Sequence, residues 1–323
     1  MKPALAEIEA AARIVYAAQP PTPQICWPLL GARVGAEVWV KHENHTAIGA
    51  FKLRGGLVYF HHLLKNGARP AGVISATRGN HGQSVGYAAK RFGIPATIVV
   101  PFGNSREKNA AMRALGVELI EHGGDFQAAR EHAAALAEQR GLHMVPSFHA
   151  HLVAGVATAS LEFLRAVPGL DVVYVPIGMG SGICGMVAAR DALGLATRIV
   201  GVVSSGAPAY ALSFAARKPL EHAVTTLLAD GMAVRTPDPD ALEIILNGVE
   251  RVAEVTDGEI AAAMRMLFED THNVAEGAGA AALAAAIKDK ETGGDRLRGR
   301  CVGLVLSGGN VDRDKYAGIL AGP

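Results

Sequence analysis

The stretch that most strongly indicates the fold reads Val172-Val173-Tyr174-Val175-Pro176-Ile177-Gly178-Met179-Gly180-Ser181-Gly182-Ile183-Cys184-Gly185. Its first four residues are apolar and mostly β-branched, which is typical of a strand inside a parallel sheet. The glycines that follow let the chain turn sharply into a helix, whose first backbone N–H groups are free to bind an anion. This order predicts a phosphate-binding turn at residues 178–182, between a buried strand and a helix.

The same alternation continues along most of the chain. Short β-branched runs predict strands at residues 37–41, 72–77, 96–101, 117–121, 172–177, 198–203 and 301–306. Longer and often alanine-rich stretches predict helices at residues 53–65, 81–92, 105–115, 126–139, 152–166, 183–193 and 259–271. Because strands and helices alternate, we expect an α/β fold with buried parallel strands.

The composition excludes several classes of protein. The 323 residues are 50% hydrophobic and 19% charged, so the chain can bury a sizeable core and is too apolar to be disordered. The 31 Lys and Arg residues balance 30 Asp and Glu residues without a block of like charge, so we expect no nucleic-acid and no membrane partner. Three separated cysteines support neither a disulfide framework nor a zinc knuckle. These features predict a cytoplasmic protein.

A single lysine stands in a glycine-flanked segment, Gly49-Ala50-Phe51-Lys52-Leu53-Arg54-Gly55-Gly56, at the expected start of a helix. A solvated lysine at a helix start is one interpretation, because a cation there opposes the helix dipole only slightly. A buried lysine would instead be neutral and nucleophilic, since burial disfavours the ammonium form. The segment alone leaves both interpretations open.

Two further motifs follow predicted strands. Ser75-Ala76-Thr77-Arg78-Gly79-Asn80-His81-Gly82-Gln83 leads into a helix, where its backbone N–H groups would suit a carboxylate. An ordinary helix N-cap by Asn80 is the alternative, and the two roles are compatible. Leu306-Ser307-Gly308-Gly309-Asn310 presents a hydroxyl at a sharp turn, although taken singly it is only a turn.

The glycine-rich turn at residues 178–185 also contains the G-x-G-x-G pattern of dinucleotide-binding proteins. That class needs a G-x-x-G ending and an acidic residue that closes the next strand, whereas the strand at residues 198–203 is followed by Ser204 and Ser205. A dinucleotide-dependent dehydrogenase or nucleotide sensor therefore stays an alternative outside the class favoured below.

All four motifs follow predicted strands, at the carboxyl ends where open α/β sheets bind ligands. A lysine nucleophile, a phosphate cradle, an amide near a ring substituent and a hydroxyl for a ring nitrogen are together what pyridoxal phosphate requires. In sequence and in order, the four motifs resemble those of the fold-type II pyridoxal-phosphate enzymes, specifically the serine/threonine dehydratases. The resemblance extends to residues 229–234, 255–257 and 276–283, and so covers nearly the whole chain.

The resemblance implies a role for each motif. Lys52 would hold the cofactor as a Schiff base and act as the catalytic base. Phe51 would pack beside the ring, Asn80 would bond its phenolic oxygen and Ser307 would face its pyridine nitrogen. The cofactor phosphate would bind to Gly178, Met179, Gly180, Ser181 and Gly182. The substrate carboxylate would bind to Thr77, Arg78, Gly79, Asn80 and His81.

The resemblance also implies the architecture and the assembly. We expect two lobes of open twisted α/β sheets, as in the tryptophan synthase β-like enzymes. Residues 1–69 and 147–323 would form a large domain that binds pyridoxal phosphate, and residues 70–146 a small mobile domain that closes over the substrate. A homodimer is expected as well.

The implied activity is that of a dehydratase, or ammonia-lyase, which converts an L-3-hydroxy amino acid to a 2-oxo acid and ammonia. The Ser307 hydroxyl favours elimination over transamination, because it cannot keep the pyridine nitrogen protonated as a carboxylate would. The alternatives are a β-replacement synthase, which would capture the dehydrated intermediate with a second nucleophile, and an amino-acid racemase.

Arg78 departs from the family pattern, in which this position is usually Ser or Ala. Racemases use a serine there as the acid for the second face, so Arg78 argues against racemisation. Its guanidinium would pair with a carboxylate or stack on an aromatic group, which extends the expected substrates from threonine and serine to phenylserine or hydroxyaspartate. An arginine that points into solvent is the alternative.

Two further absences are expected. Cation-dependent relatives have an acidic residue where this chain reads Val202-Val203-Ser204-Ser205, so we expect no metal. The histidines show no liganding pattern, and we assign a packing role to His42, His45, His61, His62, His149 and His151.

Overall fold

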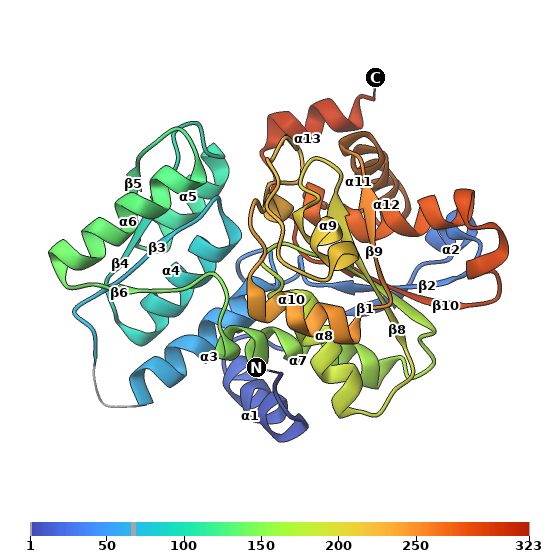
Figure 1. Cartoon of the computed structure of the whole chain (residues 1–323), viewed down its shortest axis with the longest axis horizontal. Coiled ribbons are helices and arrows are strands. Elements are labelled where there is room, and N and C mark those ends of the chain that lie inside the picture. The colour runs from blue at the N-terminus through green and yellow to red at the C-terminus, as the bar shows by residue number, and fades with distance from the viewer. Residues whose placement is uncertain (1, 66–68, 323) are drawn as a thin grey trace.

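The computed structural model describes residues 2–65 and 69–322. It contains a six-stranded and a four-stranded sheet, each flanked by helices, and the two lie side by side (Figure 1). The α/β class and the architecture of two open sheets are thereby confirmed.

The larger sheet has the strand order β1-β2-β10-β7-β8-β9, and all neighbouring strands run parallel except the edge pair β1 and β2. Its strands are β1 (Gln24–Cys26), β2 (Glu37–His42), β7 (Val172–Pro176), β8 (Arg198–Ser204), β9 (Arg251–Val255) and β10 (Cys301–Leu306). Its helices are α1 (Leu5–Tyr16), α2 (Pro28–Val34), α3 (Lys52–Lys65), α7 (Ala150–Ala166), α8 (Ser181–Ala192), α9 (Ala209–Ala216), α10 (Pro239–Gly248), α11 (Asp257–Thr271), α12 (Gly277–Thr292) and α13 (Arg313–Leu320). Two short 3-10 helices complete it, η1 (Asp230–Met232) and η2 (Gly294–Leu297).

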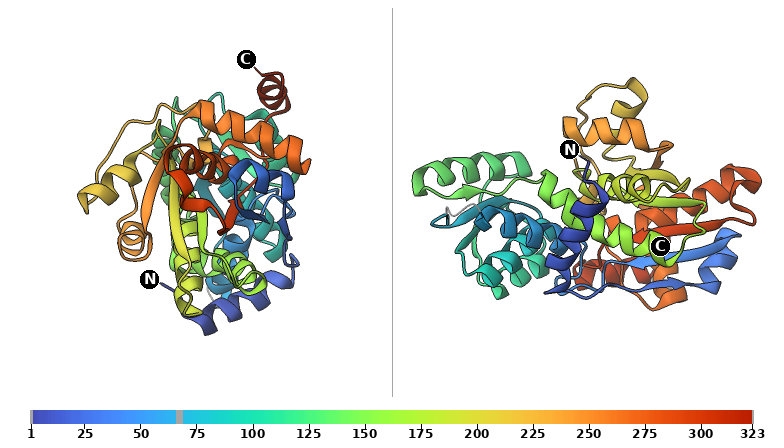
Figure 2. Two further views of the ribbon diagram at one scale, coloured as in Figure 1. Left: turned by 90° about the vertical axis from the view of Figure 1, so that its right-hand side faces the viewer. Right: turned by 90° about the horizontal axis from the view of Figure 1, so that it is seen from below.

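The smaller sheet is wholly parallel, with the order β5-β4-β3-β6. It is formed by β3 (Val73–Ala76), β4 (Ala96–Val100), β5 (Glu118–Glu121) and β6 (His143–Met144). Its helices are α4 (Asn80–Phe92), α5 (Arg106–Ala114) and α6 (Phe126–Arg140). We call these elements the small lobe and the remainder of the chain the large lobe; Figure 2 shows them side by side in the view from below.

Both faces of the large sheet are buried, as expected for parallel strands with helices on each side. On β7, Val172 and Tyr174 belong to the core shared with α11 and α12, whereas Val173 and Val175 belong to the core shared with α7 and α8. This alternation explains why the strand is apolar along its whole length.

The helix α3 joins the two lobes, because it packs on α7 of the large lobe and on α4 of the small lobe. Tyr59 and Phe60 of this helix are buried in the core of the small lobe. The small lobe is therefore one continuous segment of chain that rests on a helix of the large lobe. We propose that the domain boundaries fall at residues 70 and 146 and that the smaller part is mobile.

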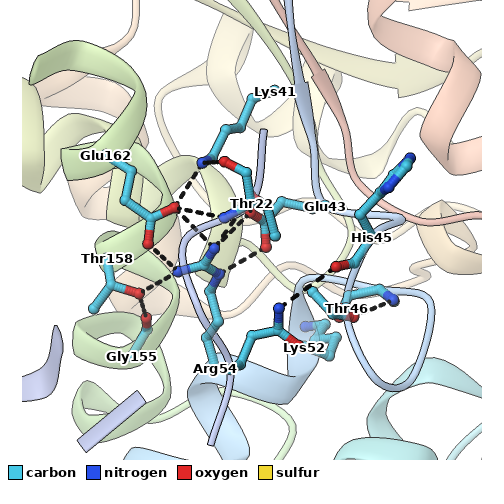
Figure 3. Close-up of polar contacts among 12 residues, drawn as sticks. Thr22, Lys41, Glu43, His45, Thr46, Lys52, Arg54, Gly155, Thr158 and Glu162 are labelled. Carbon is cyan, nitrogen blue, oxygen red and sulfur yellow. Dashed lines mark hydrogen bonds and ion pairs between the residues drawn. The ribbon is translucent and has the colours of Figure 1, made fainter. Parts of the chain in front are cut away.

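A buried ion network fixes the first turn of α3 (Figure 3). The fully buried Arg54 guanidinium donates to Glu43 at 2.8 Å and to Glu162 at 2.6 Å. Lys41, also buried, pairs with the same Glu162 at 2.6 Å. Burial alone would raise the pKa of Glu162, but Arg54 and Lys41 outweigh it and hold that pKa below its usual value.

Every strand and helix expected from the sequence is present, with ends that shift by at most two residues. One expectation about burial was wrong: β5 is an edge strand, and its terminal residues Glu118 and Glu121 are exposed. A strand with one unpaired edge tolerates charged side chains. No helix among the described residues is long and apolar enough to cross a membrane.

Candidate active site

One cavity of about 140 Å³ lies between the lobes, at the carboxyl ends of β3, β7 and β10. The structure brings together on its wall every residue that the sequence analysis placed in the site: Phe51, Lys52, Thr77, Arg78, Gly79, Asn80, His81, Gly178, Met179, Gly180, Ser181, Gly182 and Ser307. This is the edge at which open α/β sheets bind ligands.

Lys52 is the first residue of α3, and its Nζ donates a hydrogen bond to Ser181 Oγ at 3.1 Å. The same Nζ lies 5.0 Å from the centre of the Phe51 ring. Enclosure by protein lowers the pKa of Lys52 to about 8, because the ammonium form loses its water. Lys52 is half-buried at the cavity wall, and its lowered pKa favours the interpretation of a partly neutral, nucleophilic amine near pH 8.

The glycine-rich turn leads from β7 into α8, whose N-cap is Gly180. Gly180 has φ of 100°, a conformation that side-chain-bearing residues rarely adopt. A Cβ atom on Gly178 would lie 2.4 Å from the carbonyl oxygen of Gly231, so only backbone fits there. The turn thus brings the first N–H groups of a helix to the cavity wall, where they suit a phosphate.

The Ser307 turn is tied to the segment that carries Lys52. The N–H of Phe51 donates to the carbonyl oxygen of Ser307 at 3.0 Å, and the N–H of Gly309 donates to Gly49 at 2.9 Å. This pairing fixes the position of the Ser307 hydroxyl relative to Lys52, on the wall of the same cavity.

The segment 77–81 connects β3 to α4. Its backbone is stabilised by Thr77, whose Oγ1 accepts from the N–H of Gly79 at 3.0 Å. The capping role considered for Asn80 was wrong, because Gly79 is the N-cap and no side chain caps this helix. The Asn80 amide instead donates to Glu276 at 2.5 Å and accepts from Asn310 at 2.8 Å.

The other two side chains of this segment behave differently. Burial, followed by the charge of Lys52, lowers the pKa of His81 to about 3, and its buried Nε2 has no hydrogen-bond partner. His81 is therefore neutral, and its Nε2 is enclosed by protein. Arg78 is exposed at the mouth of the same cavity.

Sequence reasoning assigned no role to a second set of residues on the wall. Lys108 from α5 pairs with Asp230 at 2.7 Å and with Glu276 at 3.1 Å. Asp230 and Glu276 lie inside stretches that resemble the family, which was a usable signal. Lys108 had no such signal, because the sequence around it is that of an ordinary solvent-exposed helix, in which lysines are common.

Comparison with known proteins shows which family the chain belongs to. The chain matches the family described as "Pyridoxal-phosphate dependent enzyme" over residues 15–308. The chain belongs to this family. It is 35% identical over 285 residues to the L-threonine ammonia-lyase of Thermotoga maritima, a match that covers 88% of this chain and 70% of the relative.

Solved structures of this family agree in fold. The processed threonine deaminase isoform 2 of Solanum lycopersicum superposes with a TM-score of 0.90 at 29% identity, covering 99% of this chain and 92% of that one. A serine racemase from maize superposes with a TM-score of 0.91 at 28% identity, covering 99% and 98%. The architecture expected of a fold-type II pyridoxal-phosphate enzyme is confirmed.

The cavity of this pyridoxal-phosphate enzyme also fits the cofactor chemically. Lys52 supplies an amine whose lowered pKa suits reaction with an aldehyde. The Gly178 to Gly182 turn supplies backbone donors for a phosphate, with Gly178 too closely packed to carry a side chain. Ser307 supplies a hydroxyl on the same wall. We propose that these residues hold the cofactor in the roles given above.

The six histidines to which we assigned a packing role each lie against another histidine or aromatic ring. His62 and His151 stack with ring centres 4.0 Å apart, and His42 accepts from Trp27 at 3.0 Å. Among residues 2–65 and 69–322, no group of three or more His, Cys, Asp or Glu side chains is arranged to hold a metal ion.

Proposed function

We propose that the chain is a pyridoxal-phosphate-dependent dehydratase that converts an L-3-hydroxy amino acid to a 2-oxo acid and ammonia. The observation that carries the proposal is the pairing of a largely desolvated Lys52 amine with Ser181 of the glycine-rich turn, at 3.1 Å, inside the cavity that Ser307 also lines. Relatives named as threonine ammonia-lyase and threonine deaminase support the same activity.

The cofactor, when bound, supplies an electron sink for the charge left on Cα of the amino acid. The protein supplies the proton transfers. Once the Lys52 amine is free, its Nζ, with a pKa of about 8, can take the α-proton. The β-hydroxyl takes up one proton and leaves as water, which balances the α-proton that Lys52 removes. Water returns when the imine product hydrolyses, so the net products are the 2-oxo acid and ammonia.

Binding of the substrate carboxylate is assigned to residues 77–81. This segment carries backbone N–H groups at the start of α4, where an anion is favoured. The carboxylate would be held mainly by backbone donors, since His81 remains uncharged at every physiological pH.

The substrate range is proposed to reach beyond threonine and serine. Arg78 shares the cavity wall with the apolar side chains of Phe126, Met232 and Val234. A guanidinium beside apolar side chains suits a phenyl group or a second carboxylate on Cβ, as in phenylserine or hydroxyaspartate. The solvated alternative for Arg78 predicts threonine and serine alone.

A racemase is the second candidate, because a serine racemase superposes on the chain with a TM-score of 0.91. Racemisation needs an acid on the face of Cα opposite Lys52. Arg78 occupies the position at which racemases of this family are expected to have their serine acid. A guanidinium does not give up a proton near neutral pH. Elimination is therefore favoured.

The deciding experiment is a screen of L-3-hydroxy amino acids for release of ammonia and 2-oxo acid by the purified enzyme. We expect turnover of at least one of threonine, serine, phenylserine and hydroxyaspartate, and complete loss of turnover in Lys52→Ala. D-amino acid product without ammonia would support the racemase, and ammonia release suppressed by an added thiol would support β-replacement.

We also propose that the enzyme acts in the cytoplasm as a homodimer. The proposal rests on the family resemblance and on the three cysteines, all of which are free. Light scattering of the purified protein measures the mass of the assembly against the 33.5 kDa of one chain.

A further inference from the structure

Helix α5 of the small lobe touches the large lobe in two places. At its exposed edge, Ser105 Oγ donates to Asp312 at 2.6 Å and Arg106 pairs with Asp314 at 3.3 Å. Both partners of that ion pair are largely solvated, with 85% and 64% of their side chains exposed, so the pair contributes little. The second contact, made by Lys108, is buried.

Lys108 reaches from α5 across the cavity wall to two carboxylates of the large lobe. Its side chain is only 7% exposed, and those of Asp230 and Glu276 are 29% and 2% exposed. Burial alone would lower the pKa of Lys108, but Glu276 and Asp230 outweigh it and raise that pKa. Among the described residues, Lys108 is the one cation in ion-pair contact with either carboxylate.

The same contact includes the segment that is assigned to the substrate carboxylate. A Cβ atom on Gly79 would lie 2.4 Å from Cδ of Lys108, so the lysine stem lies directly against the backbone of that segment. Glu276 Oε2 accepts from Lys108, and its Oε1 accepts from the Asn80 amide. One buried carboxylate of the large lobe therefore holds two side chains of the small lobe.

We propose that Lys108 is a positioning residue, which holds residues 77–81 over the cofactor site by pairing with Asp230 and Glu276 when the lobes are together. It acts through Gly79 and Asn80, and the inference rests on the proposed function only in the choice of substrate. Loss of the cation leaves Asp230 and Glu276 of the large lobe close together without a partner from the small lobe, which removes the attraction that holds the lobes together.

The test compares the holoenzyme with Lys108→Met, Lys108→Arg and the control Arg106→Met. The control removes an ion pair between the same two lobes from the same helix, with the same replacement side chain. We expect Lys108→Met to raise KM for the best substrate by about ten- to a hundredfold, the range for a lost charge-assisted hydrogen bond. Lys108→Arg should recover part of that loss, and Arg106→Met should stay within about twofold.

Binding of pyridoxal phosphate separates positioning from general damage. Most residues proposed to hold it belong to the large lobe, so its affinity should change little in Lys108→Met. Amide hydrogen exchange should become faster in residues 77–83 and 106–114 and stay unchanged in α7 and α8. A variant with normal KM and unchanged exchange in those residues overturns the proposal, even if its melting temperature falls.

Asp230→Asn provides a second route should Lys108→Met fail to fold. It removes one partner of Lys108 without leaving an unpaired charge of its own, and we expect a smaller rise of KM in the same direction. The exchange comparison needs no turnover. An enzyme inactive on every 3-hydroxy amino acid would contradict the proposed function, while the exchange rates would still decide the role of Lys108.

Discussion

At the scale of single residues, the pKa of Lys52 decides when the amine can react. Burial lowers that pKa to about 8, so the neutral form is lost as the pH falls below 8 and dominates above it. We expect the rate at which cofactor-free enzyme takes up pyridoxal phosphate to rise with pH and level off above about pH 8. The growth of visible absorption after mixing, at a series of pH values, measures it.

A lysine derivative in solution is the natural control for that series. Its amine has an ordinary pKa of about 10.4, so its rate should keep rising well beyond pH 8. If the enzyme follows the derivative, the Lys52 amine is solvated and the proposed role of its burial is wrong. Lys52→Ala should develop no such absorption at any pH.

Single residues also show what sequence can and cannot predict. Lys52, Asn80, Ser307 and the turn at Gly178 were found because each motif combines residue types that the chemistry needs with the end of a strand. Lys108 was missed because its partners are far away in sequence, Asp230 by 122 residues and Glu276 by 168. A contact between distant residues leaves no local pattern.

At the scale of elements, the turn between β7 and α8 depends on Gly180. Its φ of 100° is costly for any residue with a Cβ, and a Cβ there would lie 2.7 Å from that of Ala241. We expect Gly180→Ala to weaken pyridoxal-phosphate binding at least tenfold, because the turn must move away from its phosphate-binding conformation. Titration of the cofactor by absorption measures the affinity.

Gly194→Ala is the matched control for that substitution. Gly194 follows the same helix α8, has φ of 65° and has nothing within 4 Å of a built Cβ. It should lose stability through the same backbone strain and leave cofactor affinity unchanged. Equal loss of affinity in both variants would show that Gly180 acts through helix stability alone.

Strands differ in how well their own sequence predicts them. The strands from Val172 and Cys301, and the strand from Arg198 after its first residue, carry no charged side chain, since helices cover both faces of their sheet. Each was predicted within a residue of its observed end. β1 and β6 have three and two residues, too short for any periodic pattern to appear. Such strands exist because a neighbouring strand supplies their hydrogen bonds.

At the scale of the whole molecule, the ion network around Arg54 ties α3 and α7 to the strand that precedes Glu43. We expect Arg54→Met to lower the free energy of unfolding by about 3–5 kcal/mol, because it leaves Glu43 and Glu162 buried without their main partner. Urea unfolding of the holoenzyme measures the loss. Arg140→Met, which breaks the exposed pair with Glu118, should cost less than about 1 kcal/mol.

The small lobe is one unbroken segment of the chain, from Val73 to Met144. Residues 77–81, Lys108 and Phe126 of the cavity wall all belong to it, whereas Lys52, the glycine-rich turn and Ser307 lie outside it. Two genetic crossovers, one on each side of this segment, would replace all of these small-lobe residues together. The residues outside it, including the reactive amine, would stay in place. Descendants of one ancestral gene could thereby acquire a new substrate preference while their catalytic residues stay the same.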